Sequence, residues 1–267
     1  MTTSPARLRT ARFAAQGIAA PGLRPTEVVE RMLAVQGQDL GQVLWAIGVR
    51  APGSTRDDVR EAFDRGELVR SWPMRGTLHA LRPDDLRLLL DEWAPATAEL
   101  PDRDEALRRV LLGYLRGRGP ATEADAASWT KLPLGDLRRA RAAAGDAVED
   151  LGDGLLDLAD RPAAARIPTG HLLPGFDEYL LGYADRSAQL DPAHADRVVP
   201  GANGMFLPMA VVRGRVVGTW KRTERRAGHL VTVTPFGALD ASSVRALEAA
   251  AARYAAFLGA PVATTVV

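Results

Sequence analysis

The fold of the first third of the chain is decided by the segment Leu68-Val69-Arg70-Ser71-Trp72-Pro73-Met74-Arg75-Gly76-Thr77-Leu78-His79-Ala80-Leu81. It reads as two short strands around a turn, with Pro73 and Gly76 at or near that turn. The apolar residues before it recur at helical spacing and predict three helices. These helices span residues 7–16, 25–35 and 55–65. The pattern therefore changes from helical to extended within residues 1–90.

Three helices followed by a hairpin is the element order of a winged helix, so we expect residues 1–90 to form one such module. In winged helices the third helix or the wing usually meets nucleic acid. On or near the wing lie Arg70, Trp72, Arg75 and His79, and we expect these side chains to bind DNA. The alternative is that Trp72 belongs to the core and that the arginines are solvated.

The same order recurs in a weaker form over residues 91–165. Helices are predicted at residues 104–116, 122–130 and 134–144, and a hairpin at 148–158. This segment is expected to form a second winged-helix module. Its wing carries five carboxylates, which DNA phosphates would repel. They are Glu149, Asp150, Asp153, Asp157 and the adjacent Asp160. We therefore expect the second module to be a spacer rather than a reader of DNA.

After Pro162 the pattern becomes extended, and residues 166–267 are expected to form a β-rich domain. Strands are predicted at residues 205–212, 215–222 and 229–234, followed by a last helix at 242–257. Between the second and third strands lies a basic cluster. It contains Lys221, Arg222, Arg225 and Arg226. This cluster is either a solvated turn or a set of phosphate contacts.

Composition and charge limit the functional classes. The 267 residues carry a net charge of +1, but residues 1–90, 91–200 and 201–267 sum to +3, −7 and +5. Two basic ends around an acidic middle fit a nucleic-acid face built from both ends, and equally fit domains that attract one another. The chain has no Cys, which excludes disulfides, thiolate metal sites and cysteine nucleophiles. With no apolar leader and no run of ~18 apolar residues, we expect a cytoplasmic protein without membrane contacts.

Neither a metal nor a cofactor is predicted. The four histidines do not have the spacing of metal ligands, and no Cys is present to complete a site. They are His79, His171, His194 and His229.

Two amides stand close together in Gln36-Gly37-Gln38-Asp39, where the predicted helix over residues 25–35 ends. A buried Gln has two donors and two acceptors that need partners. The pair can therefore position a water, hold the edge of a nucleobase, or cap backbone groups. Asp39 is the one nearby group that could accept a proton, and its alternative role is that of a helix C-terminal or turn acid.

Four segments in this order resemble the winged-helix DNA glycosylase superfamily of AlkZ- and YcaQ-like proteins. They are Leu33-Ala34-Val35-Gln36-Gly37-Gln38-Asp39, Trp72-Pro73-Met74-Arg75-Gly76-Thr77-Leu78-His79, Leu172-Leu173-Pro174-Gly175-Phe176-Asp177-Glu178-Tyr179-Leu180-Leu181-Gly182-Tyr183 and Asn203-Gly204-Met205-Phe206. Such proteins excise alkylated bases, and some unhook interstrand crosslinks. The resemblance implies an α+β fold of tandem winged-helix modules followed by a small C-terminal β-barrel-like domain. The DNA would lie in the concave face.

The family's catalytic motif is Gln-x-Gln in one branch and Gln-x-Asp in another, with an apolar residue usually at x. Gln36 and Gln38 match the first form, and Gly37 departs from it. An N7-alkylated purine is cationic and leaves readily, so amides that position a water against the sugar could suffice. No candidate Schiff-base lysine is near the motif. The resemblance therefore implies a monofunctional DNA glycosylase, a hydrolase acting on double-stranded DNA with alkylated bases.

Relatives of this kind generally have three winged helices, whereas here residues 86–90 pass directly to residues 91–95. The sequence therefore predicts a short member that lacks the middle winged helix. Such a chain is a compact variant with an open cleft, an inactive one, or one that forms a homodimer to rebuild the cleft. Two other functions stay open: a non-catalytic winged-helix DNA-binding protein or regulator, and a protective binder or hydrolase of a small genotoxic metabolite.

Overall fold

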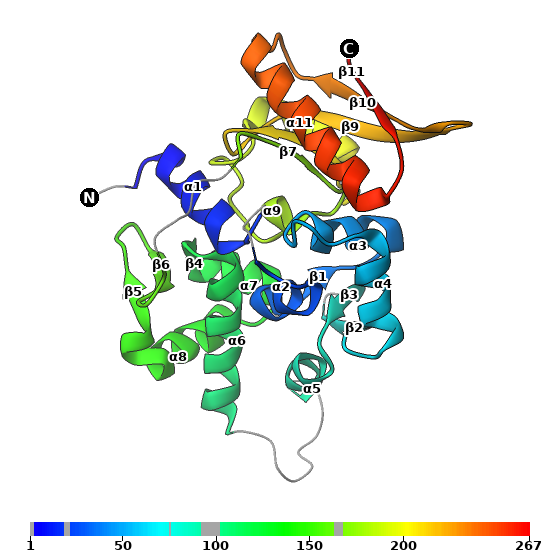
Figure 1. The fold of residues 1–267 in the computed structure, drawn as a ribbon. Coiled ribbons are helices and arrows are strands. Elements are labelled where there is room, and N and C mark those ends of the chain that lie inside the picture. The colour runs from blue at the N-terminus through cyan, green and yellow to red at the C-terminus, as the bar shows by residue number, and fades with distance from the viewer. Residues whose placement is uncertain (1–2, 19–21, 75, 92–101, 163–167) are drawn as a thin grey trace.

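The computed structural model describes residues 3–18, 22–74, 76–91, 102–162 and 168–267. It is a mixed α+β fold in which three units share one hydrophobic core (Figure 1). The first unit is blue to cyan, the second is green, and the third carries the largest sheet at the top of the view. Helix α1 (Pro5–Ala15) lies between the second unit and this sheet, outside the first unit.

The first unit runs helix, strand, two helices and hairpin. Its elements are α2 (Pro25–Met32), β1 (Val35–Gln36), α3 (Leu40–Gly48), α4 (Arg56–Asp64), β2 (Val69–Met74), β3 (Thr77–Leu81) and a closing helix α5 (Pro83–Asp91). The strand order is β1-β3-β2, and the register pairs Gln36 with His79. The predicted hairpin is confirmed. The helix predicted over residues 25–35 instead ends at Met32, and its last predicted residue, Val35, is the first residue of β1.

Helix α3 was not predicted, because its sequence is a short apolar run in which a helix and a strand look alike. Residues 43–48 are buried without interruption. Asp39 caps its first turn by accepting from the Gln42 backbone N–H at 2.8 Å. Consequently the three helices that precede the hairpin in the first unit are α2, α3 and α4, and α1 is not one of them.

The second unit repeats the element order of the first. Its elements are α6 (Arg103–Arg118), β4 (Ala121–Thr122), α7 (Glu123–Thr130), α8 (Leu134–Ala144), the 3-10 turn η1 (Gly145–Ala147), β5 (Val148–Asp150) and β6 (Leu155–Leu158). All three predicted helices and the hairpin are confirmed, and the strand order β4-β6-β5 matches that of the first unit. In β4, Thr122 is both the last strand residue and the N-cap of α7. In the first unit, residues 37 and 38 separate β1 from the N-cap Asp39.

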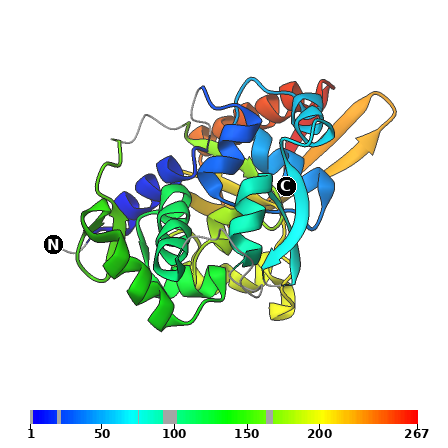
Figure 2. The same cartoon turned by 90° about the horizontal axis from the view of Figure 1, so that it is seen from below.

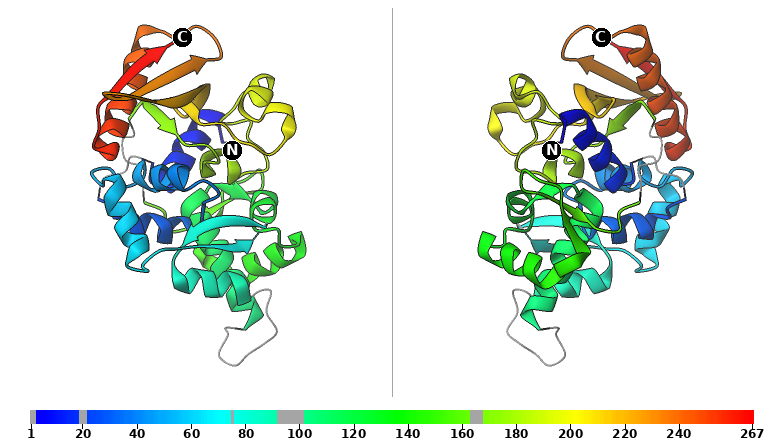
Figure 3. Two further views of the ribbon diagram at one scale, coloured as in Figure 1. Left: turned by 90° about the vertical axis from the view of Figure 1, so that its right-hand side faces the viewer. Right: turned by 90° about the vertical axis from the view of Figure 1, so that its left-hand side faces the viewer.

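The third unit is built on an open five-stranded sheet, so the expected β-barrel-like domain is wrong. Its elements are β7 (Gly170–Leu173), α9 (Glu178–Leu181), η2 (Pro192–His194), α10 (Ala195–Val198), η3 (Pro200–Ala202), β8 (Met209–Val212), β9 (Arg215–Arg225), β10 (Gly228–Pro235), α11 (Ala241–Leu258) and β11 (Val262–Val266). The strand order is β11-β10-β9-β8-β7, with β7 and β11 at opposite edges. Helix α11 covers one face of the sheet (Figure 3). The apolar side chains on that face are therefore buried without the sheet closing into a barrel.

The β9–β10 hairpin is longer than the sequence predicted. The strands continue to the pair Arg225–Gly228, and only Arg226 and Ala227 form the turn. The hairpin projects past the rest of the molecule (Figure 2). Within the described residues, no helix has the length and apolar character that a membrane crossing requires.

Candidate functional site

The candidate site centres on residues 36–39, the glutamine loop, which joins β1 to α3. Only 8% of Gln36 is exposed. Its backbone N–H donates to Glu178 Oε1 at 3.0 Å. Its side-chain Oε1 is buried and has no hydrogen-bond partner among the described residues. An unsatisfied buried oxygen costs about 1–3 kcal/mol, so this atom is suited to accept a hydrogen bond from a water or a ligand.

Gln38 lies on the solvent side of the same loop. Its side chain is exposed, and its Oε1 accepts from the Leu78 backbone N–H at 3.2 Å. The Gly37 N–H donates to the Leu78 carbonyl at 2.8 Å. These two bonds attach the loop to β3, so the two glutamines and the β2–β3 hairpin form one local structure.

The close approach of β3 explains the glycine at position 37. A Cβ atom there would lie 3.1 Å from the Ala80 N and 3.2 Å from the His79 carbonyl carbon. It would also lie 3.4 Å from Cγ of Arg70. A larger residue at this position would press on the wing backbone, so the departure from an apolar residue has a steric cause.

Asp39 is the N-cap of α3 and does not lie at the C-terminal end of a helix. Its exposed carboxylate is engaged by the Gln42 N–H. Asp39 therefore has a structural role, but as an N-cap and not as the helix C-terminal acid that the sequence offered.

The predicted wing residues differ in their exposure to solvent. Trp72 is 62% exposed, so the alternative that it belongs to the core is wrong. Arg70 is exposed two positions away on β2, and Cγ of its side chain lies beside Gly37. His79 is fully buried, with Nδ1 2.9 Å from the Thr77 carbonyl, so it lies beneath the surface of the hairpin. Arg75 lies outside the described residues.

A cavity of about 640 Å³, here called the basic groove, is lined by Asp39 of the glutamine loop but by neither Gln36 nor Gln38. It runs between α3 and α4 on one side and β9 and α11 on the other, and Asp39 and Leu40 line its end. Four basic side chains also line it. These are Arg56 and Arg60 from α4, and Lys221 and Arg222 from β9.

The electrostatics of Tyr254 show that the two basic sets converge. Burial raises the pKa of the Tyr254 hydroxyl above its ordinary value, while Arg222 and Arg56 act in the opposite direction. Arg222 belongs to β9 and Arg56 to α4. The groove therefore concentrates positive charge from two distant parts of the sequence beside the glutamine loop.

Arg225 and Arg226 lie at the exposed end of the β9–β10 hairpin, outside the groove. Several basic side chains of β2, α4 and the β9–β10 hairpin form no ion pair with a carboxylate within the described part of the chain, whereas other arginines do. The unpaired residues are Arg60, Arg70, Lys221, Arg222, Arg225 and Arg226. Arginines and lysines that are not neutralised within the protein are available for phosphates.

Comparison with known families then identifies the chain. The family described as DNA glycosylase AlkZ-like matches residues 29–103 and 89–257. The chain belongs to the AlkZ-like DNA glycosylase family.

Two relatives place this AlkZ-like chain further. It is 33% identical over 168 residues to an interstrand DNA cross-link repair glycosylase of Streptomyces sahachiroi. This match covers 59% of the chain and 44% of the relative, so it spans less than half of the relative's length. The solved structure of Streptomyces sahachiroi DNA glycosylase AlkZ superimposes with a TM-score of 0.83 at 23% identity, covering 100% of both chains. That likeness shows that the two proteins share a fold.

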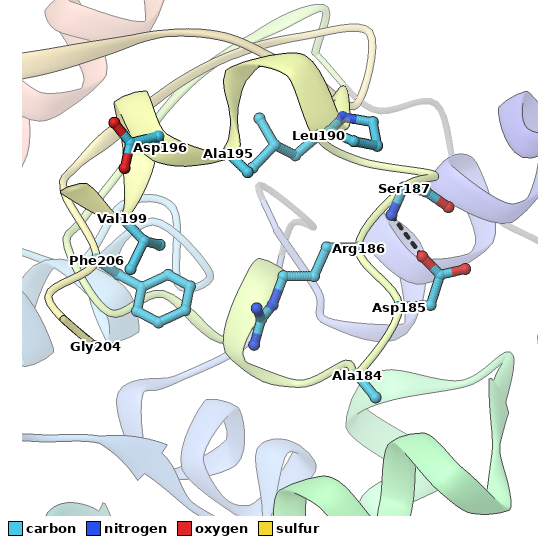
Figure 4. Close-up of a pocket in the computed structure, with 11 residues that line it drawn as sticks. Ala184, Asp185, Arg186, Ser187, Leu190, Ala195, Asp196, Val199, Gly204 and Phe206 are labelled. Atoms are coloured by element: carbon cyan, nitrogen blue, oxygen red, sulfur yellow. Dashed lines mark hydrogen bonds between the residues drawn. The ribbon is translucent and has the colours of Figure 1, made fainter. Parts of the chain in front are cut away.

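A second cavity, of about 630 Å³, lies in the third unit of this AlkZ-like chain (Figure 4). Its polar side is formed by Asp185, Arg186 and Ser187, and Leu190 and Phe206 contribute apolar surface. Cζ of Arg186 lies 5.0 Å from the centre of the Phe206 ring, and burial lowers the Arg186 pKa. The described residues that line this cavity include none of the glutamine loop, so it is separate from the candidate catalytic site.

Sequence reasoning missed two groups in the AlkZ-like site. Arg56 and Arg60 are spaced i,i+4 on a helix that was predicted, so their helical spacing could have indicated a shared face. Glu178 contacts the glutamine loop from 142 positions away, and no local pattern announces that contact. Among the described residues, no group of three or more His, Asp or Glu side chains could hold a metal ion.

Proposed function

We propose that this chain is a DNA glycosylase that hydrolyses the N-glycosidic bond of alkylated purines, of the N7 type or bulky. Its substrates would include purines joined in an interstrand crosslink. The single observation that carries the proposal is the buried, unpartnered Oε1 of Gln36 beside Gln38 in a chain of this family. Such an oxygen can hold a water by accepting its hydrogen bond.

The chemistry asks little acid or base strength of the protein. When the C1′–N9 bond breaks, its electron pair moves onto the cationic purine and neutralises it. Water then adds to the oxocarbenium-like sugar at C1′ and releases its proton to solvent. Gln36 and Gln38 would orient this water, and neutral amides cannot serve as strong bases. The enzyme should therefore act on destabilised lesions and leave normal bases in place.

The DNA would lie along the wing and the basic groove. We propose that both helix–strand–helix–helix–hairpin units are winged helices, because their element orders and sheet topologies agree. Arg70 and Trp72 would meet the duplex from the wing. The basic residues of α4 and of the β9–β10 hairpin would meet it from the groove. The second unit, whose Asp150 already pairs with Arg141, would serve as a spacer.

The absent middle winged helix remains our proposal. The two matched segments of the family overlap at residues 89–103, where the sequence predicts the missing module. The relative is also the longer protein, since the same match fills a smaller share of it. Both observations support a short member with a more open cleft.

The test is release of N7-methylguanine from an alkylated duplex by the wild type, Gln36→Ala and Gln38→Ala. We expect each variant to lose release by on the order of 100-fold or more, because a positioned water is lost. Abasic sites should become visible only after alkali, without strand cutting by the protein. Lys221 lines the groove, so borohydride trapping of a DNA–protein adduct would contradict the monofunctional assignment.

Two results would change the assignment. Duplex binding without release in the wild type would favour the non-catalytic winged-helix regulator. Release that survives in both glutamine variants would show that the reaction does not depend on the glutamine loop. In each case the variants must retain the wild-type melting temperature and duplex affinity.

A further inference from the structure

The backbone immediately before the glutamine loop is strained. Leu33 has φ 60° and ψ −49°, a conformation that side-chain-bearing residues rarely adopt. The Ala34 N–H donates to the Met32 carbonyl at 2.6 Å, which closes a three-residue turn around Leu33. Turns with this sign of φ are uncommon and cost free energy, so the surrounding structure must hold this one in place.

Arg118, at the end of α6, holds both sides of that turn. Its Nη1 donates to the Met32 carbonyl at 2.8 Å and its Nη2 to the Ala34 carbonyl at 2.9 Å. The side chain is fully buried, and its Cζ lies 4.0 Å from the centre of the Trp129 ring. One guanidinium from the second unit therefore fixes two carbonyls of the first.

Glycines allow α6 to come this close. A Cβ at Gly117 would lie 2.8 Å from the Arg31 carbonyl oxygen and 3.0 Å from the Met32 Cα. A Cβ at Gly113 would lie 3.2 Å from the Leu33 side chain. Larger residues at these positions would push Arg118 away from the turn.

Glu178, the first residue of α9 in the third unit, completes the arrangement. Its Oε2 accepts from Arg118 Nη2 at 2.7 Å and from Trp129 Nε1 at 2.9 Å. Its Oε1 accepts from the Gln36 N–H. The carboxylate and the guanidinium are both fully buried, and each neutralises the other.

We propose that Arg118 and Glu178 are positioning residues that hold the turn at Leu33 and the Gln36 backbone, and so set the place of both glutamine side chains. The inference rests on the proposed glycosylase function. Neither residue needs to touch DNA. All three units meet at this pair, so the second and third units fix the reactive loop of the first.

A neighbouring ion pair supplies a matched control. Asp177 and Arg50 are also fully buried and lie 2.8 Å apart. Arg50 contacts Gln16 and the Ala46 carbonyl, and Asp177 contacts the Tyr179 N–H. None of these bonds reaches residues 32–38. Loss of this pair should lower stability as much as loss of Arg118–Glu178, without moving the glutamine loop.

The experiment compares Glu178→Gln with Asp177→Asn in the full chain. Single-turnover release of N7-methylguanine should fall on the order of 100-fold in Glu178→Gln, with duplex affinity unchanged, because the water is misplaced. Asp177→Asn should lose stability to a similar degree and keep its release rate. Equal slowing by the two variants would overturn the proposal.

Two further measurements keep the proposal testable. Trp129→Phe preserves the ring beneath Arg118 and removes one donor to Glu178, so it should fold and show an intermediate loss of release. Hydrogen exchange at the Gln36 amide should quicken by on the order of 10-fold in Glu178→Gln and stay at the wild-type rate in Asp177→Asn. If the wild type releases no base, the proposed glycosylase function is wrong. The exchange comparison then still decides whether Glu178 holds the Gln36 backbone. Unchanged exchange in Glu178→Gln would refute that positioning role.

Discussion

Gly37 is the residue at which folding and chemistry are most directly linked. In Gly37→Ala the new Cβ meets backbone atoms of β3, which cannot rotate away. We expect a loss of about 1–3 kcal/mol in the free energy of unfolding, together with slower base release. Urea unfolding and single-turnover kinetics measure the two effects.

Gly135→Ala is the control for that substitution. Gly135 lies in α8, and a Cβ there meets nothing within 4 Å. It should be neutral or stabilise the fold by up to about 1 kcal/mol through helix propensity. A Gly37→Ala variant as stable and active as Gly135→Ala would contradict the steric explanation.

At the residue scale, the paired glutamines could be predicted from the sequence, but the atoms that surround them could not. The unpartnered oxygen of Gln36 depends on which atoms cover it, and the Glu178 contact spans 142 positions. Trp72 and His79 occupy the same hairpin, yet one is exposed and the other fully buried. Strand register and the packing beneath the hairpin decide this difference, and local composition predicts neither.

Helix α4 and the β9–β10 hairpin form the two walls of the basic groove, and each should contribute to the salt dependence of DNA binding. Arg60→Ala should weaken duplex binding regardless of sequence and lower the slope of log K against log salt by about 1. Titrations at several salt concentrations measure this slope.

Arg65→Ala tests whether the effect is specific to the groove. Arg65 follows the same helix, but it pairs with Glu61 at 2.8 Å and does not line the groove. Its loss should leave the slope unchanged. Equal slopes for both variants would remove α4 from the proposed DNA face.

Most elements with amphipathic or alternating patterns were predicted from sequence, including the helices of the second unit and three strands of the large sheet. Two physical causes account for several of the elements that escaped. Helix α3 is buried without interruption along residues 43–48, and β1 and β4 have two residues each. The barrel was expected by resemblance, whereas the pairing of β11 beside β10 leaves β7 at an open edge.

The whole molecule should lose stability in mild acid through His171. Burial lowers its pKa from 6.5 to about 4, with the charges of Arg253 and Arg50 acting in the same direction. The unfolded chain therefore binds this proton at a higher pH than the folded one. Stability is complete above pH 6.5 and falls by about 1.4 kcal/mol per pH unit down to about pH 4.

His171→Leu isolates this contribution. Between pH 6.5 and about 4 the variant should lose less stability than the wild type. Above pH 6.5 the free energies of unfolding of the two proteins should change with pH in parallel. Chemical unfolding at a series of pH values measures both. Identical slopes in acid would show that His171 does not bind its proton on unfolding.

The size of the molecule bears on how it would enclose DNA. If the middle winged helix is absent, as we propose, the two basic walls and the acidic middle segment would leave part of the duplex uncovered. A homodimer on DNA would restore the enclosure, and a lone copy would act through an open cleft. The mass of the complex on a single lesion-bearing duplex separates these arrangements.

The contact between Gln36 and Glu178 has a consequence for synthesis on the ribosome. The glutamines leave the exit tunnel early, and the carboxylate that holds Gln36 follows 142 residues later. A truncated or incompletely translated chain would thus carry both glutamines without the carboxylate that holds Gln36. If the glutamines and Glu178 act as we propose, base excision would begin only after α9 had left the exit tunnel, and incomplete copies would not act on DNA.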